Sequence, residues 1–172
     1  MTSNVFLIGP MAVGKTTIGR QLAKRLQLRF VDSDQEIEKR TGASIALIFD
    51  VEGESGFRDR EEQIIAELAA LDGIVLATGG GAVLREENRK ALRKRGIVVY
   101  LRASIESQLE RTKSSRHRPL LETGDRRAAL ESLMAAREPL YRQEADFIVD
   151  TDHLSAGRVA RQIARRIEQL KS

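Results

Sequence analysis

Near its start the chain reads Gly9-Pro10-Met11-Ala12-Val13-Gly14-Lys15-Thr16, a full match to the pattern G-x-x-x-x-G-K-[ST]. The match follows an apolar run at residues 5–8 that predicts a strand. It precedes a stretch at residues 17–26 in which Ile18, Leu22 and Leu26 share one helical face. Glycine at both ends lets successive backbone N–H groups turn inward, and the N-terminus of the helix adds partial positive charge. The sequence therefore predicts a phosphate-binding loop (P-loop) between a strand and a helix.

The predicted loop suits a nucleoside triphosphate, with Lys15 reaching the β- and γ-phosphates and the Thr16 hydroxyl ligating Mg²⁺. Such a loop leaves the chemistry open, because GTPases, ATPases and small-molecule kinases all use it. The only asparagines, Asn4 and Asn88, do not precede a lysine, so the Asn-Lys-x-Asp segment that reads guanine is missing. A chain of 172 residues is also short for a larger ATPase motor. We therefore favour a kinase that acts on a small acceptor.

Apolar runs of strand length alternate with amphipathic stretches, which is typical of a parallel sheet covered by helices. We expect strands at residues 5–8, 29–32, 74–77, 97–101 and 146–150. We expect helices at residues 17–26, 35–40, 59–71 and 86–95, from residue 104 to 111, and at the C-terminus, with residues 41–58 ambiguous. The expected fold is a single α/β domain over residues 1–172, a P-loop NTPase-type three-layer sandwich with a five-stranded parallel sheet and helices on both faces.

Composition narrows the function classes. Lys plus Arg number 29 against 25 Asp plus Glu, and the interspersed signs indicate solvated helix faces more than a nucleic-acid surface. Phe and Tyr total seven, few for base stacking. Zero Cys excludes disulfides, thiolate metal sites and a Cys nucleophile, and fits a reducing compartment. The start of the chain lacks a basic flank, and no run of about 18 apolar residues occurs. We expect a cytoplasmic protein that does not span a membrane.

A polar segment at residues 113–127 contains Pro and Gly and shows no periodic face. Such a long loop inside a compact domain is uncommon unless it is a lid or a binding element. We therefore expect a mobile lid there, carrying Arg116 and Arg118. The two histidines, His117 and His153, have no third partner in the sequence and are interpreted as surface residues.

The residues that follow each strand are site candidates, because ligands bind beyond the carboxyl ends of the strands in an open parallel sheet. Asp32 and Asp34 follow the second strand. Asp32 can hold a water on Mg²⁺, and Asp34 can accept a hydrogen bond from an attacking hydroxyl. The same residues also suit a helix N-cap, and both roles can coexist. Three glycines at residues 79–81 follow the third strand, where they allow close backbone approach to a ligand or simply form a turn.

Arginine binds a carboxylate with a planar pair of hydrogen bonds that lysine cannot make. The candidates for this role are Arg58, Arg116, Arg118 and Arg137. Each one alone also fits a surface position, and spacing does not choose among them.

Several further motifs occur in order along the chain. They are Ser33-Asp34-Gln35-Glu36-Ile37-Glu38, Gly56-Phe57-Arg58-Asp59-Arg60-Glu61, Thr78-Gly79-Gly80-Gly81, Arg118-Pro119-Leu120-Leu121 and Arg137-Glu138-Pro139-Leu140-Tyr141. With the P-loop, they closely resemble the bacterial shikimate kinase family over essentially the whole chain. The resemblance implies transfer of the γ-phosphoryl group of ATP, with Mg²⁺, to the 3-hydroxyl of shikimate in chorismate and aromatic amino-acid biosynthesis.

By this resemblance Asp34 binds the ring hydroxyls and orients or deprotonates the attacking one, acting with Lys15 and the lid residue Arg118 as the catalytic groups. The implied shikimate contacts are Asp34, Arg58, Gly80, Gly81 and Arg137, and the implied metal contacts are Thr16 and Asp32. The implied ATP contacts are Gly9, Ala12, Val13, Gly14, Lys15, Thr16, Thr17, Arg111, Arg118 and Leu154.

Two positions depart from the family's pattern. The loop interior is Ala12-Val13, so the bulkier Val13 is expected to alter loop conformation or ATP affinity, and Leu154 stands where some members have a polar or basic neighbour of adenine. A gluconate kinase or a nucleoside monophosphate kinase would share the P-loop, and a nucleotide-regulated nucleic-acid module is the alternative from another class. The expected partners are shikimate and ATP only, with no nucleic acid and no membrane, and we expect a monomer.

Overall fold

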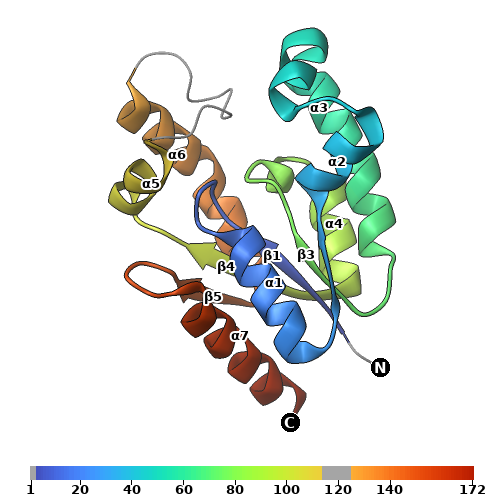
Figure 1. Ribbon diagram of the computed structural model, residues 1–172, viewed down its shortest axis with the longest axis vertical. Coiled ribbons are helices and arrows are strands. Elements are labelled where there is room, and N and C mark those ends of the chain that lie inside the picture. The colour runs from blue at the N-terminus through green and yellow to red at the C-terminus, as the bar shows by residue number, and fades with distance from the viewer. Residues whose placement is uncertain (1–2, 114–124) are drawn as a thin grey trace.

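A computed structural model describes residues 3–113 and 125–172 of the chain (Figure 1). Its strands form one five-stranded sheet in the order β2-β3-β1-β4-β5, and every neighbouring pair is parallel. The strands are β1 (Asn4–Ile8), β2 (Arg29–Asp32), β3 (Ile74–Ala77), β4 (Gly96–Arg102) and β5 (Phe147–Asp150). Parallel strands need crossover connections, and helices supply them here. The expected parallel α/β fold is confirmed.

Helices cover both faces of the sheet (Figure 1). They are α1 (Lys15–Leu26), α2 (Ser33–Thr41), α3 (Ile45–Ala69), α4 (Glu86–Arg95), α5 (Ile105–Thr112), α6 (Arg126–Glu144) and α7 (Ala156–Lys171), with a short 3₁₀ helix η1 (Ala82–Leu84). α1 and α7 pack together on one face, and α2, α3, α4 and α6 contribute to the core on the other.

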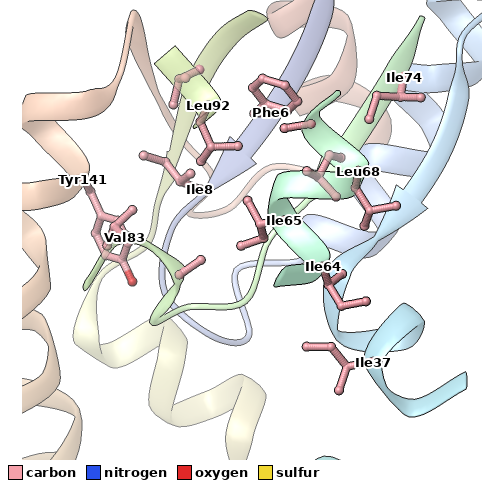
Figure 2. Packing of buried hydrophobic residues seen from close by; sticks show 14 of the residues in the cluster. Phe6, Ile8, Ile37, Ile64, Ile65, Leu68, Ile74, Val83, Leu92 and Tyr141 are labelled. Atoms are coloured by element: carbon pink, nitrogen blue, oxygen red, sulfur yellow. The ribbon is translucent and has the colours of Figure 1, made fainter. Parts of the chain in front are cut away.

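Alternation along the strands builds a separate core on each face. Phe6 and Ile8 of β1 belong to the core under α3, α4 and α6, part of which Figure 2 shows. Val5 and Leu7 of the same strand belong to the core under α1 and α7. Successive side chains of a strand point to opposite faces, so a strand covered on both sides must be apolar throughout. The loops that follow β1 and β3 are therefore held by central strands that are buried on both faces.

Three sequence expectations need correction or completion. The sequence assigned no element to residues 128–144, where the structure has most of α6, because Pro139 lies inside that helix and obscures its pattern. The lid was expected to end at Arg127, but Asp125 caps α6 and Arg127 lies in its first turn. The ambiguous residues 45–58 are helical, as part of α3, with a kink at Gly53 (φ 74°). Residues 114–124, with Arg116, His117 and Arg118, lie outside the described residues.

Candidate active site

The carboxyl ends of three neighbouring strands bring the predicted site residues together. β1 leads into the P-loop, β2 into Asp32 and Asp34, and β3 into Gly79, Gly80 and Gly81. β2, β3 and β1 are adjacent in the sheet, and Asp32 pairs in register with Ala77, so these loops begin at the same level. The predicted convergence of the three loops is confirmed.

The P-loop curls around a cleft of about 250 Å³. The residues that line it include Met11, Ala12, Gly14, Lys15, Thr16, Thr17, Asp34 and Gly80. The Lys15 ammonium donates hydrogen bonds to the carbonyls of Gly9 (2.6 Å) and Pro10 (2.8 Å), which holds it across the loop. Gly9 has φ 145°, and a Cβ there would collide with the carbonyl oxygen of Leu101, so only glycine fits. The curled backbone and the Lys15 ammonium make this cleft suited to phosphate groups.

The backbone conformation of Ala12 and the burial of Val13 show how the P-loop accommodates these two residues in its interior. Ala12 adopts the left-handed region (φ 62°), which an alanine enters at a cost of about 1–2 kcal/mol. Val13 is buried, and its side chain packs in the core under α1 with Ile18. Its bulk therefore points away from the phosphate cleft, and its expected effect on loop conformation or ATP affinity stays a prediction. Any contact of Val13 with a phosphate would come from its backbone.

Arg111 of α5 braces the loop from outside the cleft. Its guanidinium donates hydrogen bonds to the carbonyls of Ala12 (3.1 Å) and Val13 (3.2 Å), and reaches the carbonyl of Thr151 at 3.5 Å. The backbone N–H of Leu154 bonds to the same Thr151 carbonyl. Arg111 thus connects the P-loop to the loop that carries Leu154. His153 of that loop is exposed, as the sequence predicted.

Thr16 and Asp32 form an oxygen-rich corner of the cleft. The Thr16 hydroxyl donates to Asp32 Oδ2 (2.7 Å), while Asp32 Oδ1 accepts the Gln35 backbone N–H (3.1 Å) and so caps α2. The predicted N-cap role of Asp32 is confirmed, and its role at a metal stays a prediction. The described residues hold no cluster of three or more His, Cys, Asp or Glu suited to a metal. Mg²⁺ at a nucleotide site takes most of its ligands from phosphates and water, so a hydroxyl and one carboxylate fit it.

A second cavity of about 480 Å³ adjoins the phosphate cleft. The two share Met11, Thr16, Asp32, Asp34, Gly79 and Gly80 in their linings. The second cavity is also lined by apolar side chains of α3, among them Phe49 and Phe57, and by Arg58, Glu61, Gly81 and Arg137. Asp34 lies on the boundary between the two spaces. A molecule in the second cavity would face the end of a triphosphate in the first.

The Asp34 carboxyl group is poised to exchange a proton. Burial, followed by the negative charges of Glu61 and Asp32, raises its pKa from 3.8 to about 7, although Lys15 and Arg58 oppose the shift. Its Oδ1 is buried with no hydrogen-bond partner among the described residues. A carboxylate with a pKa close to neutral is a stronger base than an ordinary aspartate and is still ionised in part at pH 7. The position therefore suits a proton acceptor.

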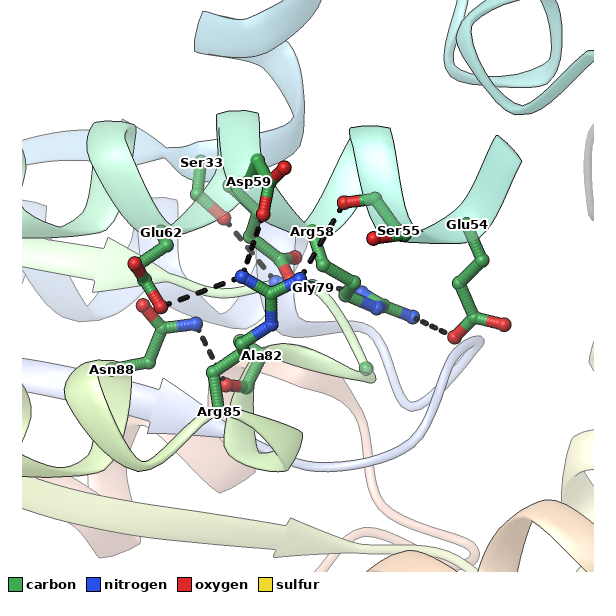
Figure 3. Close-up of polar contacts among 12 residues, drawn as sticks. Ser33, Glu54, Ser55, Arg58, Asp59, Glu62, Gly79, Ala82, Arg85 and Asn88 are labelled. Atoms are coloured by element: carbon green, nitrogen blue, oxygen red, sulfur yellow. Dashed lines mark hydrogen bonds and ion pairs between the residues drawn. The ribbon is translucent and has the colours of Figure 1, made fainter. Parts of the chain in front are cut away.

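Arg58 forms an ion pair with Glu61, one helical turn later on α3, at 2.8 Å. Both side chains are buried, and Glu54 approaches the same guanidinium from a more exposed position at 3.4 Å (Figure 3). Burial raises the pKa of Glu61 above its ordinary value, with Arg58 acting in the opposite direction. Sequence reasoning missed Glu61, although its i, i+3 spacing from Arg58 on a predicted helix is a signal for such a pair.

Arg137 of α6 is also buried, but it forms no ion pair with any carboxylate in the described ranges. Its Nη1 lies 3.3 Å from the place that a Cβ on Gly80 would take, and a Cβ on Gly81 would collide with Arg58. The glycines therefore let both guanidiniums reach the same cavity. A buried charge is normally paired, so a cavity with an unpaired buried arginine is suited to an anionic ligand.

Among the described residues, no helix is long and apolar enough to cross a membrane.

The structure brings together around the two adjoining cavities most of the residues that the sequence predicted for the site, namely Lys15, Thr16, Asp32, Asp34, Arg58, Gly80, Gly81 and Arg137. It places Arg111 behind the P-loop and Leu154 next to that brace. Arg118 is not described, so its predicted place above the nucleotide stays a prediction.

Known proteins match the chain in sequence and in fold. The family model described as shikimate kinase matches residues 11–168. A shikimate kinase of Pseudomonas entomophila is 59% identical over 167 residues, covering 97% of each chain. A solved shikimate kinase from Acinetobacter baumannii, in complex with shikimate, aligns with TM-score 0.97 at 46% identity and covers 99% of this chain and 96% of its own. The shikimate kinase from Aquifex aeolicus aligns with TM-score 0.84 at 34% identity, covering 96% of each chain.

Proposed function

Because this chain belongs to the shikimate kinase family and phosphorylates shikimate with ATP in aromatic amino-acid biosynthesis, we propose that the P-loop cleft holds the ATP phosphates and the adjoining cavity holds shikimate. The observation that carries this assignment is the buried pair Arg58 and Arg137 facing one cavity, with Arg137 lacking a carboxylate partner in the described chain. Shikimate supplies a carboxylate that fits this end and hydroxyls that fit the Asp34 end.

On the nucleotide side, the backbone N–H groups of the P-loop and the N-terminus of α1 bind the phosphates. Lys15 exchanges its bonds to Gly9 and Pro10 carbonyls for bonds to the β- and γ-phosphates. Thr17 lines the same cleft, and Ala12, Gly14 and Thr16 complete it. Arg111 supports this arrangement through the carbonyls of Ala12 and Val13, so we assign it to holding the loop as well as to flanking the base.

Thr16 and Asp32 would hold Mg²⁺, Thr16 directly and Asp32 through water. When bound there, the ion neutralises charge on the β- and γ-phosphates. The support for this assignment is the Thr16–Asp32 hydrogen bond, which places two oxygen donors at the mouth of the phosphate cleft. The Asp32 oxygen that caps α2 keeps the carboxylate oriented.

On the acceptor side, Arg58 and Arg137 bind the carboxylate and the backbone of Gly80 and Gly81 closes around the ring. Asp34 accepts a hydrogen bond from the 3-hydroxyl and takes its proton as the hydroxyl oxygen bonds to the γ-phosphorus. The bond from that phosphorus to the β,γ-bridging oxygen breaks, and ADP leaves. This in-line transfer depends mainly on positioning, since the transferring group needs little covalent help.

Five sequence predictions complete the proposal. Arg118, in the segment outside the described residues, is proposed to close over ATP and stabilise charge on the transferring group. Leu154 is proposed to contact adenine through apolar surface or backbone, because its loop is tied to the P-loop through Arg111. The single domain, the monomeric state and the cytoplasmic location stay predictions, of which the second is measured by light scattering.

A direct product assay tests the proposed function. The purified chain with Mg-ATP is expected to convert shikimate to shikimate 3-phosphate, identified by mass spectrometry and by the phosphorus–proton coupling at C3. Gluconate and nucleoside monophosphates serve as the comparison substrates, and neither is expected to be phosphorylated at a comparable rate. Failure to form any phosphorylated shikimate would overturn the proposal, and efficient turnover of gluconate would favour the alternative kinase.

A further inference from the structure

The hydroxyl of Tyr141 joins α6 to the glycine loop of the acceptor cavity. Tyr141 is fully buried, and its ring stacks on Tyr100 of β4 with centroids 4.9 Å apart. Its hydroxyl donates a hydrogen bond to the carbonyl oxygen of Gly80 at 2.5 Å. These two residues are 61 positions apart in the chain, so the bond is a tertiary one. It fixes the Gly80 backbone relative to the helix that carries Arg137.

Arg137 and Tyr141 lie four residues apart on α6 and therefore share a helical face. The Arg137 guanidinium lies near enough to this hydroxyl to lower its pKa, the two residues line one small cavity, and Arg137 Nη1 also lies beside Gly80. A tyrosine hydroxyl has one proton to donate and two lone pairs to offer. Since the proton goes to the Gly80 carbonyl, the lone pairs remain for the Arg137 guanidinium. The hydroxyl can therefore serve Gly80 and Arg137 at the same time.

The Tyr141 hydroxyl keeps its proton at neutral pH. Burial raises the pKa of Tyr141 to about 12, although the charges of Arg137 and Arg58 act in the opposite direction. The group is therefore a donor to Gly80 throughout the neutral range. Tyr141 itself is absent from the described lining of the acceptor cavity, whereas Gly80 and Arg137 both belong to it. Any influence of Tyr141 on a ligand must pass through those two residues.

We propose that Tyr141 is a positioning residue of the acceptor site, whose hydroxyl holds the Gly80 carbonyl and the Arg137 guanidinium in the arrangement that binds the carboxylate of shikimate. The inference rests on the proposed function, because it assumes that the cavity takes shikimate. Without the hydroxyl, Arg137 loses a lone-pair acceptor that orients it, and the Gly80 carbonyl loses its donor. The stacked ring alone would keep α6 on the sheet but would not select one guanidinium position.

Tyr141→Phe tests the proposal, since it removes only the hydroxyl and keeps the ring. We expect the KM for shikimate to rise about tenfold, the effect of losing one hydrogen bond to a charged group. The KM for ATP is expected to stay within about twofold, because the P-loop does not depend on this bond. The matched control is Tyr100→Phe, which removes the hydroxyl of the stacked partner, bonded to Glu138 instead of Gly80. That control is expected to leave the shikimate KM unchanged.

A double-mutant cycle separates positioning from general packing. If Tyr141 acts through Arg137, Tyr141→Phe should raise the shikimate KM in the wild-type background and have almost no further effect in an Arg137→Ala background. Equal factors in both backgrounds, or an unchanged KM in the single variant, would overturn the proposal. A wild-type chain that neither binds nor phosphorylates shikimate would instead contradict the proposed function, so the two failures are distinguishable.

A measurement on the unmutated chain keeps the proposal testable if Tyr141→Phe does not fold. The chain has only two tyrosines, so labelling with 3-fluorotyrosine should produce two fluorine resonances, assigned with Tyr100→Phe. Shikimate is expected to shift the Tyr141 resonance and to leave that of Tyr100 nearly unmoved, because the Tyr141 hydroxyl bonds to Gly80 of the cavity lining, whereas the Tyr100 hydroxyl bonds to Glu138. Absence of any shift at Tyr141 in a chain saturated with shikimate would contradict the proposal.

Discussion

The phosphate cleft and the acceptor cavity share a wall but are built in opposite ways. The phosphate cleft comes mainly from a continuous stretch, residues 9–17, and Lys15 is already bonded to carbonyls of that stretch. The acceptor cavity collects side chains from α2, α3, the glycine loop and α6, so that Asp34 and Arg137 are about a hundred residues apart in the chain. Its groups also lack full partners, since Arg58 Nε, Glu61 Oε2 and Asp34 Oδ1 are buried without hydrogen bonds in the described structure.

This difference shows which part of the site determines ligand specificity, the phosphate cleft or the acceptor cavity. A loop made of backbone N–H groups binds any suitably spaced phosphate, and its geometry follows from local φ/ψ values. A cavity made of separate side chains is specific to one ligand, because each buried group needs a partner that only that ligand supplies. Substitutions in the cavity should therefore produce large and distinct effects, whereas a conservative change inside the loop should produce a small one.

The largest effect is expected for Asp34→Asn, at the boundary between the two spaces. Asparagine keeps the size but cannot take a proton, so kcat should fall by about 10²–10⁴-fold, the usual contribution of a general base. The KM for ATP should change little, because the phosphate cleft retains its backbone. Steady-state kinetics with both substrates varied measure this split. An unchanged kcat would remove Asp34 from the proton transfer.

Arg58→Ala and Arg137→Ala should differ in stability although both weaken shikimate binding. Each loses hydrogen bonds to the carboxylate, so the shikimate KM should rise by about 10–100-fold in either variant. Arg58→Ala also leaves Glu61 buried without its partner, at a cost of about 3–5 kcal/mol. Arg137→Ala breaks no ion pair of the described chain and should lower the unfolding free energy by clearly less than Arg58→Ala does.

Thermal unfolding of the two ligand-free variants measures this contrast, with about 2–4 °C of Tm expected per kcal/mol in a chain of this size. Glu54→Gln is the matched control for Arg58, because Glu54 contacts the same guanidinium from a more exposed position. That variant should cost less than about 1 kcal/mol. Equal losses of Tm in Arg58→Ala and Arg137→Ala would contradict the inference that Arg137 forms its ion pair with the bound ligand and not with a carboxylate of the chain.

The pH dependence of stability should show the cost of ionising the buried Asp34 carboxyl group. Its pKa is raised from 3.8 to about 7 in the folded chain, so between these values the folded state binds a proton that the unfolded state has released. The free energy of unfolding contributed by this group therefore falls as the pH rises from about 4 to about 7. Asp34→Asn cannot ionise, so its Tm should exceed that of the wild type at pH 8 by several degrees and approach it at pH 5. A Tm difference that does not depend on pH would contradict this cause.

The smallest effect is expected inside the P-loop, for Ala12→Gly. Glycine removes the left-handed strain at φ 62°, but it also gives the unfolded chain more freedom, by about 0.4–1 kcal/mol. The relief of strain, about 1–2 kcal/mol, slightly exceeds this cost, so the Tm should rise by at most a few degrees and the KM for ATP should stay close to wild type. A large loss of ATP affinity would show that the alanine side chain itself contributes to the loop, and would weaken the contrast between the two halves.

The elements that the sequence predicted well are those with strong local signals. The five strands were located within one residue at either end because their apolar runs are bounded by turns and helices. Most of α6 was missed because Pro139 and the charged residues around it interrupt the apolar period. Arg58 and Arg137 were proposed only as members of a larger set of arginines, since no local pattern distinguishes a buried guanidinium from an exposed one.

By itself, the sequence determined the P-loop, the alternation of strands and helices, and the family to which the chain belongs. These features depend on backbone conformation and on periods of a few residues, which neighbours in the chain control. Only the tertiary structure decided that Glu61 pairs with Arg58, that Arg137 has no described carboxylate partner, and that the Tyr141 hydroxyl holds Gly80. The reason is that burial and partnership are set by segments brought together when α3 and α6 pack over the sheet.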